Sequence, residues 1–98
     1  MIELTSKQRK ALEKQAQALN PVVMVGQNGV TESVIAKTAE SLASHELIKI
    51  KFIDFKEESK NLAQKLAESC DATLVRVIGF VAILYRQAED EKKRHIKL

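Results

Sequence analysis

Four consecutive residues, Gly26-Gln27-Asn28-Gly29, have the clearest potential for chemistry in this sequence. They follow a short apolar run, Pro21 to Val25, and precede a segment of helical period. Because glycine has no Cβ, both glycines can take positive φ and let another backbone approach closely. The next helix would direct its unpaired N–H groups and the positive end of its dipole to the same point. The pattern favours contact with a phosphate backbone, as in the Gly-x-x-Gly loop of KH domains, although that loop joins two helices.

Three other interpretations of this loop stay open. Asn28-Gly29 is the preferred pair of a type I′ hairpin turn, but the residues after Gly29 do not alternate as a strand would. A structural turn without a ligand explains four residues equally well. A mononucleotide site is the third, although the loop lacks the Lys-Ser/Thr of a P-loop and the third glycine of the dinucleotide fingerprint.

Basic residues recur on the segment that precedes this loop. Lys7, Lys10 and Lys14 fall on one narrow helical stripe, nearly opposite Leu12 and Ala16. No acidic residue shares the stripe, so it can serve as a phosphate-binding face. An ordinary solvated helix face is the simpler explanation.

A second basic set lies in the segments of strand period. Lys49 and Lys51 alternate with apolar residues and therefore share the outer face of one strand. Arg76 and Arg86 can join them from the last two strands. Phosphate contacts of this kind give affinity and salt dependence but little sequence selection, so we expect recognition of structured RNA or its backbone. Lysines that protect a sheet edge against aggregation are an equally good explanation.

The sequence offers no catalytic set, and we expect no enzyme, metal site, cofactor or small-molecule substrate. His45 and His95 are far apart in sequence, and Cys70 falls on an apolar helical stripe that predicts a buried, inert thiol. A single cysteine excludes an internal disulfide and a thiolate zinc cluster. The acidic cluster Asp54, Glu57 and Glu58 is placed where carboxylates complement the start of a helix. Its residues can also hold a metal, which is the less favoured interpretation.

Composition limits the class of protein. The 98 residues suffice for one domain, and 45% hydrophobic with 30% charged residues predict a soluble globular chain. Sixteen basic residues against 13 acidic ones leave a net charge of +3, a weak preference for polyanions. The N-terminus lacks the pattern of a signal peptide, and no apolar run approaches membrane-spanning length. We therefore expect a cytosolic (cytoplasmic) protein without membrane contact.

Alternation of period along the chain predicts an α/β fold of order αβαβαββ. Helix signals include the capping-box pair Thr5 and Gln8, and the pattern predicts a four-stranded mixed sheet with three helices packed on one face. We expect one domain over residues 1–86 and a charged, mobile C-terminal tail over 87–98. The predicted helices run from Thr5 to Asn20, Thr31 to His45 and Glu57 to Cys70, and the strands cover 21–25, 47–53, 73–78 and 81–86.

Three separated motifs in this order resemble the bacterial YhbY proteins, the stand-alone form of the CRM domain. The motifs are Pro21–Glu32 with the glycine loop, His45–Lys51, and Val77–Arg86. The resemblance extends from Thr5 to Arg86. It implies a fold similar to the C-terminal domain of translation initiation factor three.

The resemblance also implies a function. Members of that family bind RNA and are associated with precursors of the large ribosomal subunit, and their plant relatives act in group II intron splicing. The proposed RNA contacts of the family correspond to Gly26–Gly29 and to Lys49 and Lys51. Two departures stand out: Gln27 is neutral where a basic residue is frequent, and Phe80-Val81 replaces a Lys-Thr pair. The main alternative is a protein-interaction module that docks on the ribosome.

Overall fold

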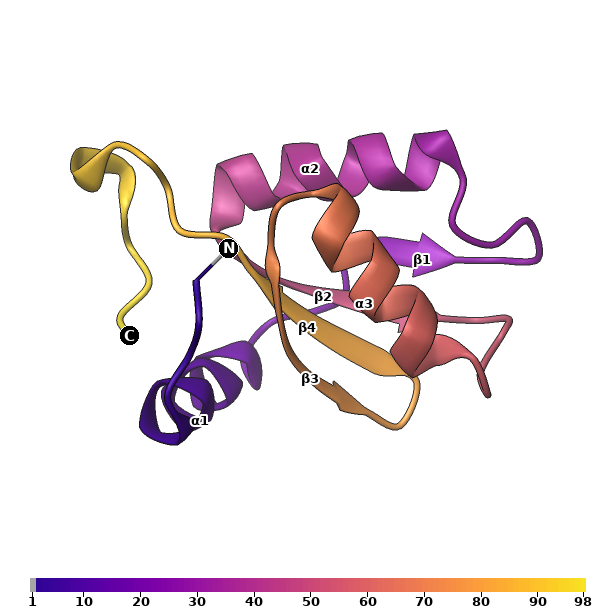
Figure 1. Ribbon diagram of the computed structural model, residues 1–98, viewed down its shortest axis with the longest axis horizontal. Coiled ribbons are helices and arrows are strands. Elements are labelled where there is room, and N and C mark those ends of the chain that lie inside the picture. The colour runs from indigo at the N-terminus through magenta and orange to yellow at the C-terminus, as the bar shows by residue number, and fades with distance from the viewer. Residues whose placement is uncertain (1) are drawn as a thin grey trace.

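The computed structural model describes residues 2–98 and has the predicted element order, αβαβαββ. Helices and strands make an α/β fold with one mixed sheet, followed by a turn of 3₁₀ helix (Figure 1). The elements are α1 Ser6–Ala16, β1 Val23–Val25, α2 Glu32–His45, β2 Leu47–Phe52, α3 Ser59–Ser69, β3 Thr73–Ile78, β4 Val81–Tyr85 and η1 Glu91–Lys93.

The four strands are ordered β1-β2-β4-β3 across the sheet. β1 runs parallel to β2, whereas β4 is antiparallel to both β2 and β3. A parallel pair needs a long crossover, which α2 provides between β1 and β2. β3 and β4 are joined by a tight turn at Gly79, whose φ of 58° favours glycine. The predicted mixed sheet is confirmed.

Helices α2 and α3 cover one face of this sheet and enclose the larger apolar cluster. Ile48, Ile50 and Phe52 alternate along β2 toward that side and are at most 2% exposed. Leu42 of α2 and Leu66 of α3 pack against them. Burial of these branched and aromatic side chains supplies the main apolar stabilisation of this half of the molecule.

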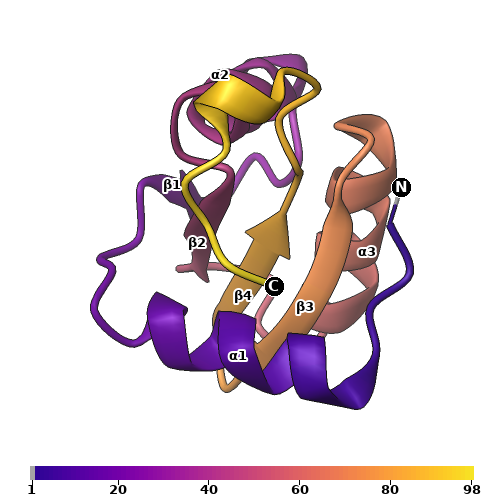
Figure 2. The same ribbon diagram turned by 90° about the vertical axis from the view of Figure 1, so that its left-hand side faces the viewer.

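Helix α1 lies on the opposite face, so the prediction of three helices on one face is wrong for α1. Its buried residues Leu12 and Ala16 pack with Leu47 and Ile83, which point away from α2 and α3. In Figure 2 the helix crosses in front of β4 and β3. The prediction fails because the two lysines of β2 mark only the uncovered end of that face.

A bulge in β3 decides which face its side chains share. Before the bulge Leu74 faces α2 and α3, and after it Arg76 faces α1. The Arg9 guanidinium of α1 donates from Nη1 to the carbonyl of Leu74 at 2.9 Å and also to the carbonyl of Val75. Ile78, two residues after Arg76, therefore shares the face on which α1 lies.

The ends of α1 show which local signals are reliable. The predicted capping box forms, because Thr5 Oγ1 accepts from the Gln8 N–H at 3.1 Å and Gln8 Oε1 accepts from the Thr5 N–H at 3.0 Å. The helix ends at Ala16, before the predicted stop at Asn20-Pro21. Leu19 consequently lies outside the helix and is exposed.

Residues 87–98, called the C-terminal strap from here on, are anchored by one buried carboxylate. Glu46 is 1% exposed and accepts hydrogen bonds from the N–H groups of Ala88 at 2.8 Å, His95 at 2.7 Å and Ile96 at 3.3 Å. A buried carboxylate requires such donors, since isolated charge in the interior is costly. The segment predicted to be mobile thus has defined partners, while its mobility in solution stays a prediction.

The strap continues from α2 to α1 (Figure 2). Gln15 of α1 donates to the carbonyl of Lys97 at 2.6 Å and accepts from the Lys97 N–H at 3.3 Å. Ile96 packs against the apolar cluster beneath α1. The strap and α1 together therefore cover one end of this sheet face and leave the other end open.

Candidate nucleic-acid-binding surface

The Gly26–Gly29 loop joins β1 to α2 and forms a tight turn. The Gly29 N–H donates to the Gly26 carbonyl at 3.0 Å, and Gly29 has a φ of 71°. Gly26, in contrast to the prediction, does not have positive φ, and a Cβ built there meets no heavy atom within 4 Å. Gly29 is therefore required by the turn itself, whereas Gly26 leaves open space beside the backbone.

The start of α2 is less available to an anion than the sequence predicts. Gln27 and Asn28 at the tip of the loop are exposed. Thr31 Oγ1 accepts from the Val34 N–H at 3.2 Å, which satisfies one of the N–H groups at the helix start. The Glu32 carboxylate in the first turn also complements the helix dipole. The positive charge for a phosphate ligand must therefore come from outside the loop.

The loop that leads from β2 to α3 lies beside the glycine loop, at the right-hand end of the sheet in Figure 1. The N–H groups of Ile53 and Asp54 both donate to the Val25 carbonyl, at 2.9 and 3.2 Å. The Phe55 ring packs on Gly29, with Cε2 3.5 Å from the position of an added Cβ. The segment after β2 thus supports the glycine loop from one side.

The segment leading into α3 carries negative charge. Asp54, Glu57 and Glu58 are all exposed there. Lys56 Nζ lies 4.7 Å from the centroid of the Phe80 ring and makes a cation–π contact with it. The carboxylates repel phosphates on this side of the glycine loop, which leaves the α1 side as the favourable approach.

Both lysines of β2 lie on the α1 side. Lys51 is exposed and stands in register between Met24 of β1 and Val81 of β4. Lys49 is half-buried, and its Nζ donates to the Leu19 carbonyl at 3.0 Å. Lys49 therefore also fixes the chain that leaves α1, while Lys51 is the more accessible cation.

The predicted lysine stripe of α1 adds to the same side of the molecule. Lys7, Lys10 and Lys14 are exposed, and the last two border a shallow hollow with Arg76 and Glu13. Arg76 Nη1 is 2.6 Å from Glu13 Oε1, so its charge is partly neutralised. The structure brings Lys10, Lys14 and Arg76 together, and Arg76 also ties β3 to α1.

Arg86 is separated from the other candidate residues. Its guanidinium donates to the carbonyl of Cys70 at 2.9 Å and to that of Ala39 at 3.2 Å. These carbonyls belong to α2 and to the end of α3, on the face away from α1. Arg86 also follows the end of β4 that is farthest from the Gly79 turn. The geometry gives this side chain a role in packing the helices.

Sequence reasoning misses a set of exposed apolar residues beside these lysines. Met24 and Ile78 are 50% and 53% exposed, and they lie in register with Lys51 and Val81 across all four strands. We call these four residues the Met24–Ile78 row. The apolar run over residues 21–25 resembles a fully buried strand, although in the structure Met24 faces away from the core that its neighbours enter.

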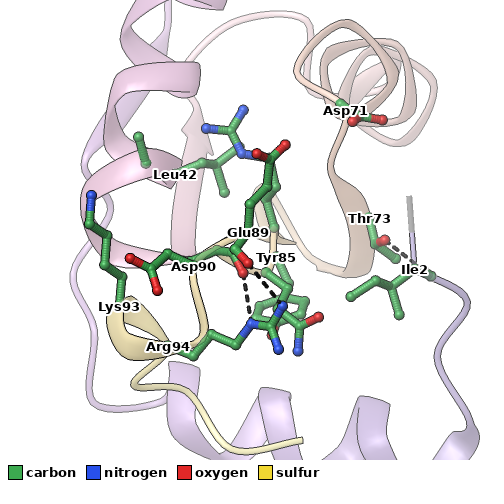
Figure 3. A pocket seen from close by; sticks show the side chains of 13 residues that line it. Ile2, Leu42, Asp71, Thr73, Tyr85, Glu89, Asp90, Lys93 and Arg94 are labelled. Atoms are coloured by element: carbon green, nitrogen blue, oxygen red, sulfur yellow. Dashed lines mark hydrogen bonds between the residues drawn. The ribbon is translucent and has the colours of Figure 1, made fainter.

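A second hollow, of about 670 Å³, lies between the strap and the start of β3 (Figure 3). Arg94 spans part of it, donating from Nε to the Ala88 carbonyl at 2.7 Å and from Nη2 to the Glu89 carbonyl at 3.4 Å. Its lining mixes acidic residues such as Asp90 with basic ones such as Lys93. This mixture does not favour a polyanion.

The described part of the chain offers few side chains that could act as nucleophiles or metal ligands. Burial raises the pKa of the Cys70 thiol, although the nearby Arg86 charge opposes this, and its Sγ lies 3.6 Å from the Ile35 carbonyl oxygen. Within residues 2–98 no three histidine, cysteine or acidic side chains gather as metal ligands would. None of the helices described is both long and apolar enough to span a bilayer.

Comparison with known proteins gives the family. The CRS1 / YhbY (CRM) domain profile matches residues 4–86, so this chain belongs to the CRS1/YhbY (CRM) family. An "RNA-binding protein" of Haemophilus influenzae is 41% identical over 93 residues, which are 94% of each chain. The Bacillus subtilis protein named "Probable RNA-binding protein YqeI" is 36% identical, over 92% of this chain and 95% of its own.

A solved structure is also similar. The solution structure of SAV1595 from Staphylococcus aureus, described as a hypothetical protein and a candidate RNA-binding protein, has a TM-score of 0.80 and 30% sequence identity. The similarity covers 97% of this chain and all of that one. The predicted resemblance to the family is confirmed.

Proposed function

We propose that this chain is a non-enzymatic, cytosolic RNA-binding protein that docks on precursors of the large ribosomal subunit during assembly. The observation that carries the proposal is the gathering of Lys10, Lys14, Lys49 and Lys51 on one side of the molecule, together with the open space beside the half-buried Gly26. The names of the relatives support RNA as the ligand. The ribosomal role is drawn from the family resemblance of the sequence motifs.

In this proposal the lysines, the glycine loop and the carboxylates each make a different contribution to RNA binding. Lysines on α1 and β2 neutralise phosphates and release counterions, which gives affinity that falls with salt. The uncharged glycine loop lets the RNA backbone approach at Gly26, because no side chain stands in front of it. Carboxylates at Asp54, Glu57 and Glu58 orient the RNA toward the α1 side by repulsion.

The salt dependence of binding to a structured fragment of large-subunit ribosomal RNA tests the proposal. We expect Lys49→Ala/Lys51→Ala to lower the slope of log K against log salt by about 1 for each lysine. Because Lys49 also binds the Leu19 carbonyl, the folded state of the variant is checked by circular dichroism. An unchanged slope in the folded variant contradicts the role of these lysines.

A further inference from the structure

The Met24–Ile78 row is an uncovered strip of sheet. Each strand contributes one residue, through the register pairs Met24 with Lys51, Lys51 with Val81, and Val81 with Ile78. α1 covers the neighbouring part of this face at Leu47 and Ile83, yet Met24 and Ile78 stay about half exposed. Two large apolar side chains left half exposed on one strip, with Lys51 and Val81 between them, mark a candidate binding surface.

The charges around the row select the class of partner. Lys51 stands at its centre, and Lys49 is the adjacent residue on the same side of β2. The carboxylate of Glu13, which lies on the same side of the molecule, is paired with Arg76 at 2.6 Å. A partner that fits this strip therefore combines negative charge with flat apolar surface.

We propose that the Met24–Ile78 row packs against unpaired bases of the bound RNA while Lys51 contacts the adjoining phosphate. The inference rests on the proposed function and names the form of RNA that the site selects. A continuous duplex keeps its bases stacked inside and presents phosphates and sugars, so it would leave Met24 and Ile78 in water. An unpaired nucleotide presents a base face and a phosphate together.

The position of the row agrees with this ligand. It lies between the segment that follows α1, where Lys49 donates to the Leu19 carbonyl, and the glycine loop that follows β1 directly. Strands in a sheet are about 4.8 Å apart, so a row of four spans roughly 14 Å, enough for more than one base. Methionine and isoleucine offer apolar area without hydrogen bonds, so the row would favour unpaired bases without reading their sequence.

Two matched hairpin RNAs test this inference, one with a short uridine bulge and one fully paired. We expect the parent protein to prefer the bulged hairpin. Met24→Ser/Ile78→Ser should lose about tenfold in affinity for the bulged hairpin, because less apolar area is buried against the bases, and keep its affinity for the paired one. Its salt slope should equal that of the parent, since no charge is removed. Leu98→Ser, another exposed apolar residue, should bind both hairpins as the parent does.

The outcomes separate the inference from the proposed function. Equal affinity of the parent for both hairpins, an unchanged affinity of the serine variant, or an equal loss on both hairpins overturns the inference. The proposed function survives those results if the Lys49→Ala/Lys51→Ala variant still lowers the salt slope. Absence of salt-dependent binding to either RNA overturns both. Because Met24 and Ile78 are exposed, the serine variant should fold, which a thermal melt checks.

Discussion

Gly26 and Gly29 have different functions within one loop. Gly29 has a left-handed backbone and packs against Phe55, so Gly29→Ala should cost about 1–2 kcal/mol of folding free energy. Gly29→Asn should cost less, because asparagine tolerates this conformation. Gly26→Ala meets open space and should leave stability almost unchanged. Its methyl group should obstruct an RNA backbone at the proposed contact.

Denaturant unfolding and RNA affinity, measured on the same variants, check this division. Gly26→Ala should weaken binding more than Gln27→Ala does, since in the proposed function the loop acts through close approach and not through the Gln27 side chain. A larger loss for Gln27→Ala would refute the account of the loop. Gly26→Ala is the cleaner variant because its effect on binding is not confounded with folding.

Arg86 contributes to stability through two backbone carbonyls. Arg86→Met removes the charged donor to Cys70 and Ala39 and should lower the free energy of unfolding by about 1–3 kcal/mol. The RNA affinity of the folded variant should not change. Arg76→Met, which breaks the partly exposed pair with Glu13, should cost about 1 kcal/mol or less. If the folded Arg86→Met variant lost RNA affinity, Arg86 would have to be counted as part of the binding surface.

At the scale of elements, Glu46 couples α2, β2 and the strap. It has a φ of 60°, ends α2 with an N–H bond to the Leu42 carbonyl, and accepts from the Arg86 N–H. Burial by itself raises the pKa of Glu46, but the N–H groups of Ala88, His95 and Ile96, together with the His95 charge, outweigh it. The net pKa therefore lies below the ordinary value of 4.5.

The lowered pKa of Glu46 makes the stability of the folded protein depend on pH. The stabilisation from the Glu46 carboxylate is fully present above about pH 4.5 and is lost as pH falls through the lower pKa of the folded state. We expect acidification through that range to shift the amide resonances of Ala88, His95 and Ile96 toward those of a free chain. Glu46→Gln should release them at neutral pH, whereas Glu91→Gln, an exposed control, should not.

The same resonances decide whether the strap is mobile. Free-chain shifts at neutral pH in the parent protein would mean that residues 87–98 form the mobile tail predicted from the sequence. They would also mean that Glu46 does not hold the strap in solution.

Local patterns predicted the elements well because their causes are local. The capping box at Thr5 and the alternation around Lys49 depend on neighbours a few residues away. The hydrogen bonds of the strap could not be predicted from the sequence, because Glu46 and His95 are 49 residues apart. The faces of Arg76 and Ile78 depend on a bulge whose carbonyls are bound by Arg9, again a long-range contact. Met24 is exposed because it lies at the end of the sheet that α1 does not cover.

At the scale of the whole molecule, a net charge of +3 is too small to identify a ligand. What matters is its distribution, with basic residues on the α1 side and carboxylates on the segment before α3. Lysines also occur on the opposite side, at Lys37 of α2 and Lys65 of α3, where both are exposed. These provide a control of equal charge for the central claim, which concerns position.

The most direct measurement compares the salt dependence of RNA affinity for two double variants that each lose two positive charges. Lys49→Ala/Lys51→Ala should lower the slope of log K against log salt by about 1 for each lysine. Lys37→Ala/Lys65→Ala should keep a slope close to that of the parent, because these residues lie on the far side of the sheet. Equal reductions in both variants, or none in the first, would contradict an RNA-binding surface on the α1 side.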